Sequence, residues 1–230
     1  MKKSSFAVAA LLVAGMASMA FADDTKKKAD AKGEKPKASP GWVVIEENWW
    51  LPFLHDFPIA LHNAREHYRA KEEKSAGAEI DKAISWLKYA QGHATKSTAE
   101  DLSIACSDLM DFSAALKDGK PVLSKKLDAA FAHASVALAK HHHYLSGKAL
   151  GESELKTAGK HLLAATDLLR CAAQSANLEY GSEAVMIYDE YAPYGYPDDT
   201  IVFEKSKLES NLITVKTELE KIATKLKASR

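Results

Sequence analysis

The chain has 230 residues, of which 31 are Lys or Arg, 31 are Asp or Glu, and 47% are hydrophobic. This length suits one domain, or two small ones, with a buried core, and the apolar share excludes disorder throughout the chain. A nucleic-acid-binding protein needs an excess of basic residues to neutralise phosphates, so the balanced charge argues against that class.

The N-terminus has the three parts of a secretory signal in their usual order. Lys2 and Lys3 form a short basic region, residues 6–16 form an apolar stretch, and Ala20-Phe21-Ala22 matches an A-x-A cleavage site. The apolar stretch is too short to span a membrane comfortably, and no later apolar run reaches the length of about 18 residues that a span needs. The sequence therefore predicts a periplasmic or otherwise exported protein, with no integral membrane segment after cleavage near Ala22.

Residues 23–40 follow the signal and contain six lysines but no large apolar side chain. Such a segment cannot bury apolar surface, so we expect a disordered linker. The folded domain should then cover residues 41–230.

Apolar residues recur at alternating steps of four and three along this domain, which is typical of helices that bury one face. Strand signals are nearly absent. The predicted helices cover about 56–71, 78–94, 97–119, 121–147, 153–179 and 200–228. Many of the inward positions are Ala, which lets helices approach closely. The predicted fold is all-α, an up-and-down antiparallel bundle of five to six helices.

A weak internal repeat suggests two helical hairpins within this bundle. Residues 64–68 align with 140–144 at a separation of 76 residues, and residues 80–90 align with 155–165 at 75. Each unit would be an αα-hairpin.

Part of the first hairpin resembles a family of exported all-helical proteins, the YfdX-like proteins. The resemblance rests on the signal peptide, on Ala64-Arg65, and on an I-x-x-A-x-x-x-L pattern formed by Ile80, Ala83 and Leu87. It covers about residues 57–90. It implies a link to stress responses, and it assigns no functional residue to this chain.

Histidine is the one unusual count in the composition, with nine in the chain. Neutral imidazole binds Zn, Cu, Ni and haem iron, so two or three converging histidines can form a site. Successive residues of a helix point about 100° apart, so the three consecutive histidines 141–143 cannot all serve one site. The candidate ligands are His55, His62, Glu66, His133, His141 and His161, with His62, Glu66 and His141 favoured. The alternatives are a transition-metal or non-covalent haem site between helices, and separate histidines at the surface or the core boundary.

Recognisable catalytic and cofactor motifs are absent from the sequence. It has no C-x-x-C-H for covalent c-type haem, no H-E-x-x-H or E-x-x-H for metalloenzymes, and no G-x-S-x-G, G-x-G-x-x-G or phosphate-binding loop. We therefore expect a protein that is not an enzyme.

Cys106 and Cys171 are the only cysteines. In an oxidising compartment, an even pair is compatible with a disulfide that ties the third helix to the fifth. Two buried free thiols are the alternative.

Residues 181–199 differ from the rest because Pro and Gly interrupt them, which predicts a long loop. This loop contains Tyr188, Tyr191, Tyr194 and Tyr196. Tyrosine offers contact area together with a hydrogen-bonding hydroxyl group. The loop would contact a protein or small-molecule partner, or it would cover one end of the bundle.

The last helix has a regular heptad of apolar residues between Leu208 and Leu226. This pattern suits packing onto the bundle or a coiled-coil homodimer, and packing within the chain is the simpler expectation. Together these features predict an exported, non-enzymatic helical bundle that acts as a binding, chaperone-like or stress-related protein. A periplasmic metal or haem carrier is the alternative.

Overall fold

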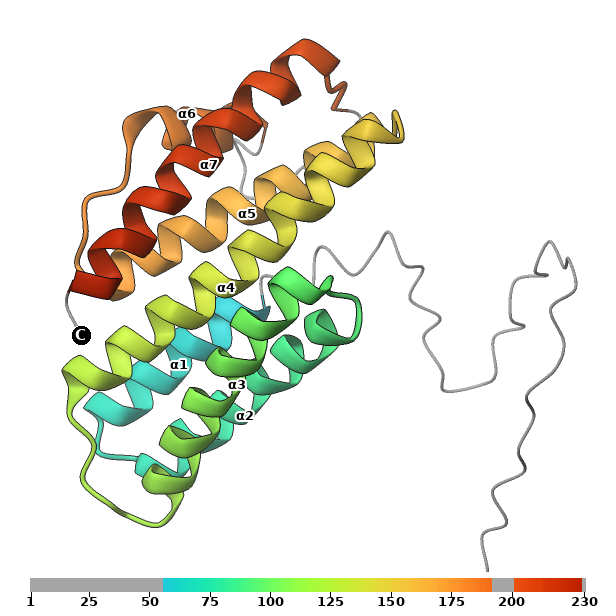
Figure 1. The fold of residues 1–230 in the computed structure, drawn as a ribbon. Coiled ribbons are helices and arrows are strands. Elements are labelled where there is room, and N and C mark those ends of the chain that lie inside the picture. The colour runs from blue at the N-terminus through green and yellow to red at the C-terminus, as the bar shows by residue number, and fades with distance from the viewer. Residues whose placement is uncertain (1–55, 192–200, 229–230) are drawn as a thin grey trace, which may run out of the picture. The chain divides into compact units, whose positions relative to one another are not determined.

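The structure is a computed structural model that describes residues 56–191 and 201–228 (Figure 1). The chain divides into two units, Met1–Val44 and Ile45–Arg230, and all described residues belong to the second. The predicted signal peptide (1–22), the linker (23–40), His55, Tyr194 and Tyr196 lie outside the described residues.

The described residues form helices and no strands, which confirms the all-α fold class. The helices are α1 (Asp56–Arg69), α2 (Glu73–Gly92), α3 (Lys96–Lys117), α4 (Ser124–Gly151), α5 (Leu155–Ser175), α6 (Ser182–Tyr191) and α7 (Lys205–Ala228). These are seven helices rather than five or six, because α6 forms where the sequence predicts a loop. None of the described helices combines the length and the apolar character that a membrane span requires.

Helix α4 lies at the centre of this arrangement, with α2 and α3 packed on one side and α5 and α7 on the other (Figure 1). Between Ala130 and His142, all side chains except those of His133 and Lys140 are buried. Most of them are Ala, Ser or Val, whose small size allows neighbouring helices to approach closely. The sequence analysis predicts a single buried stripe on this helix, and that expectation is wrong because partners cover it on several faces.

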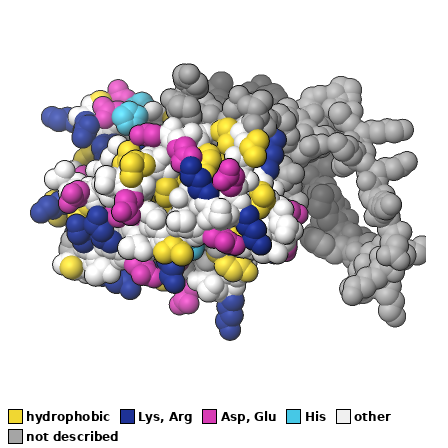
Figure 2. All heavy atoms as spheres, turned by 90° about the horizontal axis from the view of Figure 1, so that it is seen from above, with side chains coloured by type: hydrophobic (Ala, Val, Ile, Leu, Met, Phe, Trp, Pro, Cys, Tyr) yellow, Lys and Arg dark blue, Asp and Glu magenta, His cyan; other side chains and the backbone are white. Residues whose placement is uncertain are grey.

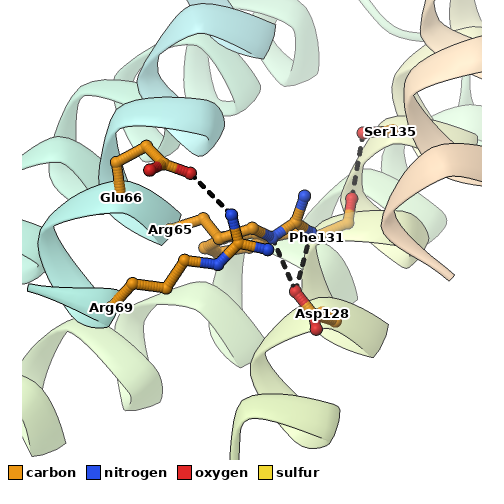
Figure 3. A network of polar contacts seen from close by, with 6 residues as sticks. All are labelled: Arg65, Glu66, Arg69, Asp128, Phe131 and Ser135. Atoms are coloured by element: carbon orange, nitrogen blue, oxygen red, sulfur yellow. Dashed lines mark hydrogen bonds and ion pairs between the residues drawn. The ribbon is translucent and has the colours of Figure 1, made fainter.

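Helix α1 is held against the N-terminal half of α4 by Arg65 (Figure 3). The Arg65 Nε donates to Oδ1 of Asp128 at 2.8 Å, and a terminal guanidinium nitrogen lies 2.7 Å from the same oxygen. The guanidinium carbon also lies 5.8 Å from the centre of the Phe131 ring. This combined ion pair and cation–π contact fixes the register of α1 on α4.

The two helical hairpins, α1–α2 and α4–α5, share the same turn. Lys71 and Ser153 have positive φ angles of 62° and 63°, and the next backbone amide in each turn donates to a carbonyl five residues earlier. This is the Schellman motif, which satisfies carbonyls at a helix end. The turns lie 82 positions apart, whereas the sequence repeat has separations of 75 and 76 residues. The sequence alignment therefore does not continue through the turns.

Helix α7 packs on α4 and α5 within the same chain. Its heptad residues Leu208, Val215, Leu219, Ile222 and Leu226 are buried, and Leu212 is partly buried. The simpler expectation of the sequence analysis is therefore confirmed. The heptad stripe is covered by the chain itself, so the alternative of a homodimer through residues 208–226 is not supported by this packing.

Two glycines offer a test of how closely α5 packs. A Cβ on Gly159 would lie 2.3 Å from the Phe203 ring, which is itself buried and stacked 5.0 Å from the Tyr191 ring. A Cβ on Gly147, at an exposed position of α4, would meet nothing within 4 Å. We expect Gly159→Ala to lower the free energy of unfolding by about 1–2 kcal/mol through overpacking. Gly147→Ala should raise it by roughly 0.5–1 kcal/mol because alanine favours the helix.

Urea denaturation of the two variants and the parent chain measures both changes. A gain in stability in Gly159→Ala would show that Phe203 does not pack against the α5 backbone as described.

Candidate functional site: a buried histidine cluster and a surface groove

Three histidines meet in the interior where α4 packs against α5. His141 and His142 are fully buried on α4, and His161 of α5 is 6% exposed. The ring centres of His142 and His161 are 5.2 Å apart, and those of His141 and His142 are 5.6 Å apart. Histidine is seldom clustered in a core without a structural or chemical role, so this group is the first candidate site.

His142 and His161 bind each other directly. Their Nδ1 atoms are 3.0 Å apart, which is a hydrogen bond between the two rings. One Nδ1 must carry the proton and the other must accept it, so this contact is satisfied when both rings are neutral. If both rings were protonated, two N–H groups would face each other across this distance. The Nε2 of His142 is buried without a hydrogen-bond partner.

His141 is the histidine of this cluster with the fewest hydrogen bonds to offset its burial. Neither of its ring nitrogens has a hydrogen-bond partner, although the side chain is fully buried. An unsatisfied buried polar group costs about 1–3 kcal/mol. Such a group in a core calls for a chemical explanation, such as a bound water or ion.

Burial sets the protonation of all three rings. Removal from water, reinforced by the charge of His93, lowers the pKa of His141 to about 4. Burial and the neighbouring imidazoles also lower the pKa values of His142 and His161 well below the usual value. The cluster is therefore neutral at physiological pH, the state in which imidazole nitrogens can bind a metal ion.

The other predicted ligands lie elsewhere. His62 and Glu66 are exposed on α1, where Glu66 pairs with Arg69 at 2.8 Å, and His133 is partly buried on α4. Within residues 56–191 and 201–228, no three His, Cys, Asp or Glu side chains are grouped in a way that could hold a metal ion. The structure thus brings His141 and His161 together, adds His142, and separates them from His62 and Glu66.

His142 is not among the candidate ligands predicted from the sequence. One position after His141 on a helix, its side chain is expected about 100° away from a single buried face. Because α4 is buried on several faces, that direction points to α5 instead of solvent. The sequence did carry a signal of burial on several faces, because the middle of this helix consists mostly of small residues and has few charges.

A groove on the surface is the second candidate. It has a volume of about 220 Å³ and lies between α3, α4 and α7. Its lining residues are Asp101, Ile104, Ala105, Asp108, His133, Val136, Ala137, Lys140, Ala223 and Lys227. His133, one of the predicted ligands, belongs to this groove and not to the buried cluster.

The groove combines an apolar floor with charges of both signs. Lys140 donates to Asp101 at 2.6 Å across its side, while the Ile104 side chain remains 50% exposed. Figure 2 shows one face of the molecule, on which acidic and basic side chains are interspersed and hydrophobic side chains form small groups. A groove of this kind suits an apolar group flanked by charges.

The two cysteines are free thiols, Cys106 in α3 and Cys171 in α5. The disulfide considered from the sequence is therefore not formed in the structure. The physical reason is that α3 and α5 pack on opposite sides of α4, so the two cysteines lie on helices that are not neighbours (Figure 1). Burial raises the pKa of both thiols, that of Cys171 to about 12 with a contribution from Asp167.

The described part of the tyrosine-rich stretch is helical, not a loop. Tyr191 of α6 is buried, and its ring centre is 5.0 Å from that of Phe203. Tyr188 is partly buried, with the Arg170 guanidinium 5.4 Å from its ring centre. These two side chains help to hold α6 on the bundle.

None of the family models, curated proteins or solved structures compared with this chain matches it. The functional argument therefore depends on the geometry of the two candidate sites.

The state of the cysteines can be checked directly. Unfolded in denaturant without reductant, the chain should give two reactive thiols per molecule with a thiol-specific reagent. The folded chain should react much more slowly, because burial keeps both groups in the unreactive protonated form. Detection of fewer than two reactive thiols in denaturant would show that Cys106 and Cys171 are bonded to each other after all.

The histidine cluster should make the fold sensitive to acid. In the unfolded chain imidazole has a pKa of about 6.5. Between about pH 6.5 and 4, the histidines of the unfolded state therefore bind protons, whereas the buried histidines of the folded state remain neutral. The free energy of unfolding should therefore fall as the pH falls through this window. His141→Leu should remove roughly 2–3 kcal/mol of that fall, given a folded pKa of about 4.

Urea denaturation at a series of pH values measures this dependence. His62→Gln, at an exposed position, is the matched control and should keep the parent's profile. An unchanged profile in His141→Leu would contradict a neutral, desolvated imidazole at this position.

Proposed function

We propose that this chain is an exported, non-enzymatic binding protein of the chaperone-like or stress-related kind, which holds apolar side chains of partner proteins in the groove between α3, α4 and α7. The observation that carries the proposal is the exposed Ile104 beside an alanine-rich floor. The proposal also draws on the signal-like N-terminus, on the resemblance to YfdX-like proteins, and on the absence of catalytic motifs from the sequence.

The dimensions of the groove favour a side chain over a large ligand. A volume of about 220 Å³ is below the range of roughly 300–1,000 Å³ that is usual for small-molecule pockets. It can accept one or two apolar side chains, and burying each of them is worth about 1.5–3 kcal/mol. Such modest affinity suits reversible capture of many different partners.

The rim of the groove favours polypeptide as the partner. The groove is lined by the ion pair of Lys140 with Asp101 and by Asp108 and Lys227, which together provide both signs of charge. Polypeptide segments carry apolar side chains between charged ones of either sign, so they complement such a rim. The alternative of a metal or haem carrier would use the histidine cluster instead of this groove.

The test is protection of an unfolding protein from aggregation. A model enzyme is heated with the full chain in buffer containing a chelator, and aggregation is followed by light scattering. The parent chain should suppress the scattering, and Ile104→Asp should be several-fold less effective because it places a charge where an apolar group docks. Circular dichroism checks that the variant is folded.

Ile59→Asp is the matched control, because Ile59 is 52% exposed on α1 and does not line the groove. It should protect as well as the parent chain. Failure of the parent chain to protect, or an equal loss in both variants, would overturn the proposal.

A further inference from the structure

The facing imidazoles of His142 and His161 also assign a metal site that is independent of the groove. We propose that these two residues form a two-ligand site for a soft monovalent cation of the Cu⁺ type, between α4 and α5. The Nδ1 atoms already point at each other at 3.0 Å, from two helices that form one tight hairpin. The ion would take the position of the proton that the two rings share.

Replacement of the shared proton by the metal ion requires no charged ligand. One ring must move its proton from Nδ1 to Nε2, so that both Nδ1 lone pairs face the ion and no net proton is released. With metal–nitrogen distances of about 2 Å, nitrogens on opposite sides of an ion stand up to roughly 4 Å apart. The rings therefore need to separate by about 1 Å at most, a shift within reach of small side-chain rotations.

The surroundings favour a single positive charge and a low coordination number. Within the described ranges, no carboxylate or thiolate joins these histidines to complete a group of three possible ligands. A divalent ion would bring two uncompensated charges into a buried interface, where each charge removed from water is strongly unfavourable. Cu⁺ and its redox-inert analogue Ag⁺ bring one charge and accept two nitrogen ligands in line.

His141 lies beside the pair and is not one of its ligands. Its ring is fully buried, and its centre lies 5.6 Å from that of His142. Removal of His141 therefore leaves both proposed ligands in place, which makes it a buried control position.

The first test is a titration with Ag⁺. The full chain is prepared without a polyhistidine tag, with Cys106→Ala and Cys171→Ala to remove the thiols, which bind soft metals more strongly than imidazole does. About one equivalent of Ag⁺ should bind and raise the melting temperature, because an ion bound only to the folded state stabilises it. His142→Leu and His161→Leu should each weaken binding by roughly 100-fold.

His141→Leu and His143→Gln are the matched controls. The first is equally buried and adjacent in the chain, and the second removes the third histidine of the run, whose Nε2 lies 3.0 Å from the carbonyl oxygen of Leu212. Both variants should bind Ag⁺ as the parent does. Circular dichroism and urea denaturation confirm that each variant is folded before it is compared.

The second test uses Cu⁺ itself, held under anaerobic reductant and competed against a chromophoric Cu⁺ chelator. X-ray absorption at the copper edge should report a two-coordinate ion with nitrogen ligands. No binding to the folded parent, binding that survives both His142→Leu and His161→Leu, or an equal loss in His141→Leu would overturn the two-ligand site. None of these outcomes bears on the binding of partner proteins in the groove, which is tested in the presence of a chelator. The two proposals can therefore fail separately.

Discussion

The rest of the structure depends on one constraint, the burial of the middle of a 28-residue helix, α4, on several faces. A helix can be covered on several faces only if its partners approach closely, and this requires small side chains along its middle. The run from Ala130 to Ala139 meets that requirement, because Phe131, His133 and Leu138 are its only large side chains. The hairpin with α5 and the packing of α3 and α7 both follow from this helix.

Burial on several faces also forces polar groups of α4 and α5 into the interior, where each must find a partner. The hydroxyl groups do so locally, since Ser135 and Thr166 donate to carbonyls of their own helices and Ser146 donates to the Ala158 carbonyl across the hairpin. Imidazole rings are too large for this solution. The Nδ1 atoms of His142 and His161 satisfy each other instead, whereas Nε2 of His142 and both ring nitrogens of His141 are buried without a hydrogen-bond partner. This makes this part of the core chemically distinct.

The two candidate sites differ in access and therefore in what they can bind. The groove between α3, α4 and α7 is open, with Ile104 half exposed, and suits rapid and reversible contact with a polypeptide. The histidine pair lies in a dry interface, so an ion can enter only when α4 and α5 open locally, and exchange should be slow. The exposed face of α1, where His62 and Glu66 lie, provides neither an apolar floor nor a closed environment.

The sequence by itself determined the fold class and the approximate helices, because apolar periodicity is a local property. It also determined that α7 presents one apolar stripe, and it singled out His141 and His161. Only the tertiary structure decided which faces are covered. A periodic pattern shows that a helix has an apolar face, but it does not show how many partners surround it, so His142 was assigned to the wrong side. The same reason accounts for the positions of Cys106 and Cys171 on helices that lie on opposite sides of α4 (Figure 1), and for the place of His133 in a groove to which α7 contributes from far along the chain.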